Sequence, residues 1–556
     1  MQWREIMVRT GTRYRKNKAD DHYDVIVIGS GIGGLANAAL LSKLGKKVCV
    51  LEQHYTAGGY THAYERNGYE WDVGVHYIGE VHKPWTVLRR LFDVITDGQL
   101  KWEEMDPLFD QVIIGGKEYN YLAGKDAFKD EMKKNFPSET EAIDKYVELL
   151  YRVSSLVPKF FAGQAMPRMA GLLYNRVRHK FLPDYFYKTT YEVLKELTDN
   201  EELIGVLTAQ WGDYGLPPKK ASFMMHAMVA KHYLNGGSYP VGGAAKIAET
   251  IIPVIQRSGG NVFTYAGVDE ILIKNNKAYG VRLKKGQEIT ADAVVSCAGL
   301  YPTVNKLLPE SAIKKHKLNK LLERVEISSS HICIYAGFKG TAKELGIPKK
   351  NFWIYPTSDH DDNVSKFNES LEAELPLTYI SFPSAKDPSW NERYPGKSTA
   401  EIVAPCKPEW FAEWEGSTWN KRGEEYEALK VKLTEKLMNM LYEQMPQLKD
   451  ALDYVELSTP LSTQWFQWNE EGEIYGIDHS VERFEQAWLH PVTPIKNFYL
   501  TGADVVTAGV GGALMAGVMT ASAMMGVKGY KVMGLIKKWQ PEQNTEEASK
   551  ESLQAG

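Results

Sequence analysis

The chain has 556 residues, a formal net charge of −4 and 44% hydrophobic residues. It is too long for one simple core, so we expect two or more intertwined domains. The near-neutral charge gives no electrostatic reason to expect nucleic acid as a partner, and none is expected. The four cysteines stand apart, which favours a reducing compartment and indicates neither a disulfide framework nor a metal site: Cys49, Cys297, Cys333 and Cys406.

The N-terminus carries a basic cluster: Arg4, Arg9, Arg13, Arg15, Lys16 and Lys18. No apolar segment follows the cluster, so it does not have the pattern of a secretory signal peptide. We expect residues 1–22 to form a solvated, frayed leader, with attraction to anionic lipid as the alternative. The expected location is therefore cytoplasmic, either free or peripherally attached to a membrane.

The first regular elements form a strand–helix–strand unit. Residues 23–28 are a β-branched run typical of a buried parallel strand, and residues 47–52 are a second such run. Between them, the small and apolar residues 35–44 predict a helix that ends at Gly45. This unit is the start of a doubly wound α/β sheet.

A glycine motif joins the first strand to the helix. Gly29, Gly31 and Gly34 form Gly-x-Gly-x-x-Gly, in which the first glycine makes a tight turn. The second lets a pyrophosphate approach the backbone, and the third lets the helix pack on the sheet. Glu52 ends the second strand, where an acid binds ribose hydroxyls. The sequence therefore predicts a dinucleotide site at this turn, with the phosphates at the helix N-terminus.

The middle of the chain changes character several times. Residues 81–237 are expected to be mostly helical, residues 238–308 return to mixed α/β character, and residues 309–480 are rich in strand-like segments. The polar residues 540–556 are expected to be disordered. Residues 505–527 contain no charge and reach the length of a membrane span, about 20 residues. Their Gly, Ala, Thr and Ser content indicates a buried helix instead.

A second glycine array stands near the C-terminus. A strand-like run ends in Gly502-x-Asp504, and the small-residue helix behind it begins with Gly511, Gly512 and Ala513. A carboxylate at a strand end can bind ribityl or phosphate-linked hydroxyls. The N–H groups at the start of such a helix can face the pyrimidine edge of a flavin, where reduction places negative charge.

These segments resemble the phytoene desaturase and carotenoid isomerase flavoprotein family, within the amine oxidase superfamily, and are most similar to its retinol saturases. The resemblance covers residues 22–528 and is most specific in residues 58–79 and 490–517. It implies an α/β fold with a discontinuous, Rossmann-type FAD-binding domain and an inserted substrate domain. Animal retinol saturases carry a secretory signal, so their location does not transfer to this chain. The expected FAD-binding parts are residues 23–80, 238–308 and 481–539; the substrate insertions are 81–237 and 309–480.

The resemblance also implies roles for residues outside the two glycine arrays. Gly58, Gly59, Thr61 and His62 form a second turn near the phosphates. By the same resemblance, Val268 lies beside the adenine through its backbone. Ala298 and Gly299 would then skirt the pyrophosphate.

The family resemblance suggests a lipophilic polyene, a retinoid or a carotenoid, as the substrate. Reduction of a double bond needs a hydride from the flavin and a proton from the protein. His76 and Tyr77 are the candidate acids, because the matching segment runs along the flavin ring in the superfamily. Desaturation, redox-neutral isomerisation and a flavin-stabilised lipid carrier stay open as alternatives. The electron donor also stays open, with NAD(P)H as a candidate, and so does the oligomeric state.

A last segment bears on how a lipid would enter. Residues 166–187 mix basic side chains with leucines and aromatic residues. Such a segment is either a helix at a membrane surface or an amphipathic helix that packs on the core. The sequence leaves both open.

Overall fold

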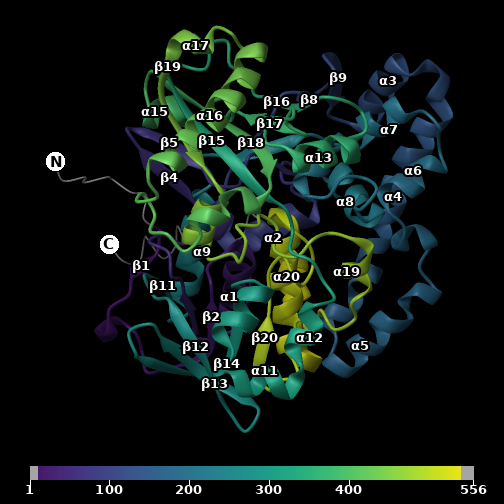
Figure 1. Ribbon diagram of the computed structural model, residues 1–556. Coiled ribbons are helices and arrows are strands. Elements are labelled where there is room, and N and C mark those ends of the chain that lie inside the picture. The colour runs from purple at the N-terminus through teal and green to yellow at the C-terminus, as the bar shows by residue number, and fades with distance from the viewer. Residues whose placement is uncertain (1–9, 540–556) are drawn as a thin grey trace, which may run out of the picture.

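The computed structural model describes residues 10–539 (Figure 1). Two sheets dominate it: one in the lower half of Figure 1, around β2 and β14, and one in the upper half, around β15 and β18. Residues 1–9 of the predicted leader and the predicted disordered tail, residues 540–556, lie outside the described residues.

The lower sheet confirms the predicted strand–helix–strand unit. Strand β2 (His22–Ile28) is followed by α1 (Ile32–Lys43) and β3 (Val48–Leu51), and β2 pairs with β3 in parallel. The sheet has the order β1-β11-β3-β2-β14-β13-β12, and β20 also pairs with β14. The remaining strands are β1 (Thr12–Arg13), β11 (Asn261–Thr264), β12 (Val268–Lys274), β13 (Lys277–Leu283), β14 (Glu288–Ser296) and β20 (Phe498–Leu500).

The register of three parallel strands brings distant segments to one edge. Ser296 at the end of β14 pairs with Ile28 on one side and with Leu500 on the other. The loops that follow these strands therefore leave the sheet side by side. In doubly wound folds this carboxyl edge is where ligands bind.

The upper sheet has the order β19-β15-β18-β17-β16-β8-β9. Its strands are β8 (Leu108–Ile114), β9 (Lys117–Leu122), β15 (Ser330–Lys339), β16 (Asn351–Tyr355), β17 (Thr378–Ser381), β18 (Lys397–Cys406) and β19 (Leu452–Ser458). Residues 81–237 thus contribute two strands to this sheet, as well as β7 (Trp102–Glu104), where mostly helix was expected. Gly115 and Gly116 between β8 and β9 both have positive φ, as a two-residue hairpin turn requires.

Helices stand beside and between the sheets. One group flanks the right-hand side of Figure 1: α3 (Lys125–Asn135), α4 (Thr140–Phe160), α5 (Arg168–Val177), α6 (Thr190–Lys195), α7 (Glu201–Leu207) and α8 (Phe223–Tyr233). The others that the site needs are α2 (Val87–Thr96), α9 (Lys246–Arg257), α14 (Pro383–Lys386), α16 (Glu424–Gln444), α20 (Gly509–Met524) and α21 (Tyr530–Lys538). Helix α20, yellow in Figure 1, packs on α1, and both are largely buried.

The close packing of α1 on α20 depends on glycine. A Cβ atom on Gly517 would lie 2.6 Å from the carbonyl oxygen of Gly33, so no other residue fits there. The predicted buried helix after residue 505 is therefore confirmed. None of the helices within residues 10–539 combines the length and the apolarity that a bilayer crossing requires.

The described part of the basic leader is ordered, which corrects the expectation that residues 1–22 fray. Strand β1 (Thr12–Arg13) pairs in parallel with β11 and extends the lower sheet. The guanidinium of Arg13 lies 4.6 Å from the centre of the Tyr265 ring. Backbone pairing and a cation–π contact together hold this segment on the sheet, while Arg13 itself remains exposed.

Candidate functional site

One cavity of about 810 Å³ contacts most of the predicted site residues. Its volume lies near the upper end of the range of ligand pockets, about 300–1,000 Å³. Of the predicted residues it is lined by Gly29, Gly31, Glu52, Gly59, Thr61, His76, Tyr77, Val268, Ala298, Gly299, Gly502, Asp504, Gly511, Gly512 and Ala513. Gly34, Gly58 and His62 lie outside its wall. Because the lining includes Gly29 and Gly31 as well as Gly502 and Ala513, segments from both ends of the chain meet in one site.

The first glycine turn has the geometry of a phosphate-binding loop. Gly29 has a φ of +91°, and a Cβ on Gly34 would lie 2.4 Å from the carbonyl oxygen of Gly29. A Cβ on Gly31 would meet only the Cys297 sulfur, at 3.9 Å. The protein itself therefore tolerates a side chain at Gly31, and the open space in front of it is available to a ligand. Gly34 serves helix packing, which is the role predicted for the third glycine.

Glu52 closes one end of this loop. Its carboxylate accepts hydrogen bonds from the Ser30 N–H (2.9 Å) and the Ser30 hydroxyl (2.6 Å), and from the His54 N–H (2.8 Å). These three bonds fix the carboxylate while it still lines the cavity. The position is the one predicted for binding ribose hydroxyls.

The second turn supports the first. A Cβ on Gly59 would lie 2.8 Å from Cα of Gly31, so the two loops touch through glycine alone. The Thr61 hydroxyl donates to the Gly58 carbonyl (2.8 Å), and Nδ1 of His62 lies 2.6 Å from the Gly59 carbonyl. Burial lowers the pKa of His62 to about 3, so this histidine is neutral and holds the turn.

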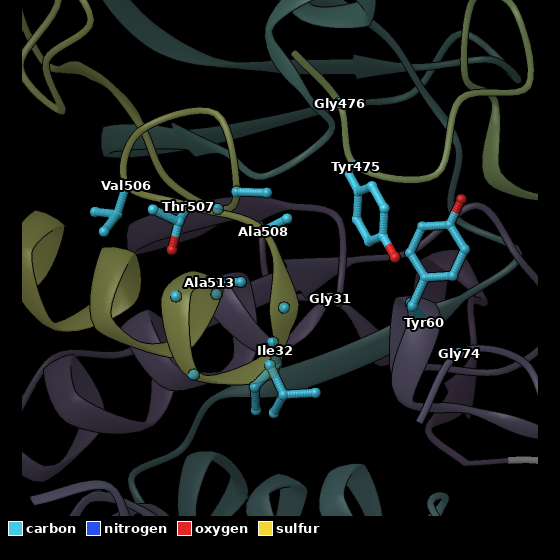
Figure 2. Close-up of a pocket in the computed structure, with 18 of the residues that line it drawn as sticks. Gly31, Ile32, Tyr60, Gly74, Tyr475, Gly476, Val506, Thr507, Ala508 and Ala513 are labelled. Carbon is cyan, nitrogen blue, oxygen red and sulfur yellow. The ribbon is translucent and has the colours of Figure 1, made fainter. Parts of the chain in front are cut away.

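The C-terminal array lies directly against this turn. A Cβ on Gly33 would lie 2.9 Å from both Cα of Gly502 and the carbonyl oxygen of Ala513. Figure 2 shows Gly31 and Ile32 beside the first turn of α20, with Ala513 labelled at that turn. The N-termini of α1 and α20 both reach the cavity wall, so two sets of N–H groups and two positive helix ends face its contents.

Asp504 joins three separate segments. Its Oδ2 accepts the Leu300 N–H (2.6 Å) and its Oδ1 accepts the Ile477 N–H (2.9 Å). The carboxylate thus fixes the Ala298–Gly299 loop, and a Cβ on Gly476 would meet Oδ1 at 2.2 Å. Asp504 lines the cavity while it holds these loops in place. Val268 lies at the start of β12, also on the cavity wall.

His76 lies on the cavity wall with one ring nitrogen turned into the protein. Its side chain is 20% exposed, and its Nδ1 lies 2.8 Å from Oε2 of Glu401, which is fully buried. Burial, and secondly the Lys386 cation, lower the pKa of His76 to about 3. The imidazole is therefore neutral at neutral pH. A histidine in this state cannot keep a store of acid by itself.

Tyr77 lies on the same wall, but its hydroxyl has a partner within the protein. The hydroxyl donates to Oδ2 of Asp110 (2.9 Å), and the ring stacks on Tyr233 with 4.1 Å between ring centres. Burial, followed by nearby carboxylates, raises the pKa of Tyr77 well above its ordinary value. This geometry favours a positioning role for Tyr77.

Three charged residues beside His76 and Tyr77 were not predicted from the sequence as site residues: Asp110, Lys386 and Glu401. All three are buried, and Lys386 donates to the His76 carbonyl (3.0 Å) and to the Ser381 hydroxyl (2.7 Å). Burial lowers the pKa of Lys386 to about 7 and raises that of Glu401 to about 8. One signal was visible: Glu401 interrupts the otherwise apolar or uncharged run of residues 398–404.

Beyond His76 the cavity becomes an apolar chamber. Its wall is formed by side chains of α8, of β16 and β17 and of the segments beside them: Trp211, Met225, Met228, Val229, Trp353, Leu377 and Tyr379. On another side Figure 2 shows Tyr60 and Tyr475, whose rings also line the cavity. Neither tyrosine was predicted from the sequence as a site residue. An apolar chamber of this kind suits a hydrophobic molecule, since burial of apolar surface drives its binding.

The comparisons with known proteins agree with this geometry. The family model described as flavin containing amine oxidoreductase matches residues 32–525. The chain is 39% identical to an all-trans-retinol 13,14-reductase of Danio rerio, over 92% of this chain and 87% of that protein. It is 24% identical to the chloroplastic prolycopene isomerase 2 of an Oncidium hybrid cultivar, over 94% of this chain and 87% of that protein.

A solved structure of wild-type putrescine oxidase bound to putrescine has a similar fold. The TM-score is 0.60 at 15% identity, with 91% of this chain and 99% of that chain covered. At this identity the likeness shows the fold alone.

Proposed function

This chain belongs to the flavin-containing amine oxidoreductase family, and from that premise we propose that it is an FAD-dependent reductase of a carbon–carbon double bond in a lipophilic polyene. The family match confirms the predicted resemblance, and the structural likeness confirms the predicted α/β fold. Family membership implies FAD as the cofactor.

The observation that carries the proposal is the continuity of one cavity. The same cavity contacts the glycine turns at Gly31 and Gly59 and the apolar chamber at Met225 and Leu377. A dinucleotide held by the turns would therefore share one enclosed space with an apolar molecule. His76 lies on the wall of this space and offers a ring nitrogen that can carry a proton.

The residues present fit FAD. The glycines leave room for a pyrophosphate, Glu52 is fixed where a ribose would bind, and two helix N-termini face the cavity. The bound flavin supplies a hydride at N5. The chamber walls exclude water and orient the polyene, and His76 holds the proton that completes the reduction.

The reductase of Danio rerio supports reduction as the reaction, since its name states a reductase of all-trans-retinol. The prolycopene isomerase supports isomerisation as the second candidate. The identity of 39% against 24% favours reduction. The three outcomes differ in mass: reduction adds two hydrogens, isomerisation changes no mass and desaturation removes two hydrogens.

The test is an anaerobic incubation of the reduced holoenzyme with a panel of retinoids and carotenoids, read by mass spectrometry. We expect one substrate to gain two hydrogens and to absorb at shorter wavelength, because its conjugated system shortens. An unchanged mass with an altered isomer would select the isomerase. No reaction with any polyene would reject both and favour a lipid carrier. The same assay with NADH or NADPH in place of the chemical reductant tests the electron donor.

We also propose that the substrate enters from a lipid surface. The cavity reaches Val87 at the start of α2 and Met533 in α21, whose side chains are 60% and 42% exposed. Exposed apolar side chains at the mouth of an apolar cavity favour contact with lipid. Replacement of both residues by Glu should weaken co-sedimentation with anionic vesicles. Val431→Glu, at an equally exposed position on α16 away from the cavity, should not.

A further inference from the structure

A buried carboxyl group lies directly behind the histidine of the site. Oε2 of Glu401 and Nδ1 of His76 are 2.8 Å apart, and both are buried atoms that complete no hydrogen bond within the described residues. The other oxygen of Glu401 accepts the Asp72 N–H at 2.8 Å. The carboxyl group is therefore held in place through one oxygen, and its other oxygen lies close to the imidazole.

From this geometry we propose that Glu401 is the proton reservoir of the site and that His76 conducts its proton to the polyene. The proposal rests on the proposed function, because it names the source of the proton for that reduction. It assigns a positioning and proton-supplying role to Glu401, a residue that does not line the cavity.

The state of each group suits this role. Burial raises the pKa of Glu401 to about 8, so at pH 7 most of it carries a proton. The imidazole of His76 has a pKa of about 3 and is neutral. Because Nδ1 faces Glu401, the proton of the neutral ring can stay on Nε2, the ring nitrogen that remains for the cavity. A neutral imidazole can therefore release the proton on Nε2 while it accepts another on Nδ1, without becoming charged.

The step balances without a charged histidine. Bound FAD would supply the hydride for one carbon of the double bond, which would leave the π pair on the neighbouring carbon. That carbon takes the proton from Nε2 while Nδ1 takes the proton from Oε2 of Glu401. The C–H and Nδ1–H bonds form as the Nε2–H and O–H bonds break. The imidazole ends neutral in the opposite tautomer, Glu401 ends as a carboxylate, and a proton from solvent resets the pair.

Lys386 stabilises the carboxylate that this step leaves. Its ammonium group makes its hydrogen bonds to the His76 carbonyl, the Ser381 hydroxyl and the Asn351 side chain, so it is held close to the pair. Its charge favours the ionised form of Glu401. The charge of Glu401 in turn acts on Asp72: burial, and secondly that charge, raise the pKa of Asp72 well above its ordinary value. The other titratable groups around the pair are Glu70, Asp110, Tyr239, His331, Cys333 and Tyr335.

The first test needs no substrate. Infrared difference spectra of the holoenzyme across pH should show a protonated carboxyl band at pH 7 that fades as pH rises through about 8. The component that fades through about pH 8 should be missing in Glu401→Gln and present in Glu473→Gln, whereas the raised pKa values of Asp72 and Asp213 leave their contributions in both variants. Glu473 is the matched control, because burial raises its pKa to about 7 and it lies outside the cavity wall. A spectrum at pH 7 that Glu401→Gln leaves unchanged would overturn the proposal.

The second test measures the polyene step in a single turnover. Glu401→Gln should slow it by roughly 10²-fold or more, the lower end of general acid catalysis, with unchanged FAD content. His76→Gln should slow it comparably, and the double variant should be no slower, since both residues serve one relay. If Glu401→Gln fails to fold, Glu401→Asp replaces it. The shorter side chain keeps the carboxyl group but moves it away from Nδ1 of His76. We expect the infrared carboxyl band to remain and the polyene step to be slower. A loss of under about twofold in either variant would overturn the relay.

The two proposals fail in different ways. If the parent enzyme reduces no polyene, the proposed function fails, and the carboxyl band still decides whether Glu401 stores a proton. If the parent reduces a polyene and Glu401→Gln does so at the same rate, only the relay fails.

Discussion

The two ends of the cavity are built in different ways. The nucleotide end consists of backbone: Gly29, Gly31, Gly59 and the first turn of α20 meet there with almost no side chains between them. The reaction end consists of side chains: His76 follows β5 (Tyr69–Asp72) in the first FAD-binding segment, whereas Lys386 belongs to α14 and Glu401 to β18. We therefore expect the nucleotide end to be most sensitive to added side-chain volume. We expect the reaction end to be most sensitive to the loss of a group that carries a proton.

The largest expected effect is at the nucleotide end. Gly31→Val should abolish retention of FAD, because its methyl groups would occupy the space for the pyrophosphate. Loss of two charge-assisted hydrogen bonds from backbone N–H groups to the pyrophosphate, about 1.5–3 kcal/mol each, weakens binding of FAD by roughly 10²-fold or more. The flavin absorbance of the purified protein measures the effect.

A control separates loss of binding from loss of folding. At Gly31 the nearest protein atom would lie 3.9 Å from a new Cβ, and at Gly534 there is none within 4 Å. Both Gly31→Val and Gly534→Val should therefore fold, and only the first should be colourless. A yellow Gly31→Val protein would contradict the placement of the pyrophosphate.

The next effect is at the reaction end. His76→Ala should leave FAD content unchanged and slow polyene reduction by about 10²–10⁴-fold, the usual contribution of a proton donor. The rate of the parent should fall as pH rises through about 8, because the raised pKa of Glu401 means that its proton is lost there. The rate should show no step near 6.5, because His76 has a pKa of about 3. Single-turnover rates between pH 5 and 9 measure both.

An outcome near twofold for His76→Ala would assign His76 to packing. A step in rate near pH 6.5 in the parent would show that the imidazole takes up charge, contrary to its burial.

The same contrast explains what could be predicted from the sequence. The glycine turns follow from spacing within a few residues, and the register of β2, β14 and β20 brings their ends together. The pairing of His76 with Glu401 depends on how the upper sheet packs on the cavity, which no local spacing encodes. The β8–β9 hairpin was missed although Gly115 and Gly116 marked it, because the helical character of its neighbours dominated the interpretation.

A smaller effect is expected at Asp504, where the two kinds of construction meet. Its carboxylate fixes the Leu300 and Ile477 N–H groups, so Asp504→Ala leaves two buried donors unpaired. We expect a loss of about 1–3 kcal/mol in the free energy of unfolding, together with weaker retention of FAD. Chemical denaturation and flavin content measure these, and Asp504→Asn should recover part of both. Flavin retained as tightly as in the parent would remove Asp504 from the cofactor site.

The smallest effect should be at Tyr77, which shares a wall with His76 but not its chemistry. Its hydroxyl donates to Asp110, and Asp110 also accepts hydrogen bonds from Gln210 (2.9 Å) and Asn351 (2.8 Å). Tyr77→Phe therefore leaves Asp110 with two partners and keeps the stacking on Tyr233. We expect a loss of about 1 kcal/mol in the free energy of unfolding and less than about a twofold change in the polyene step. Tyr279→Phe, at an exposed position, is the control for stability. If Tyr77→Phe instead slowed the polyene step as much as His76→Ala, the proton would come from the Tyr77–Asp110 pair, and the relay through Glu401 would be displaced.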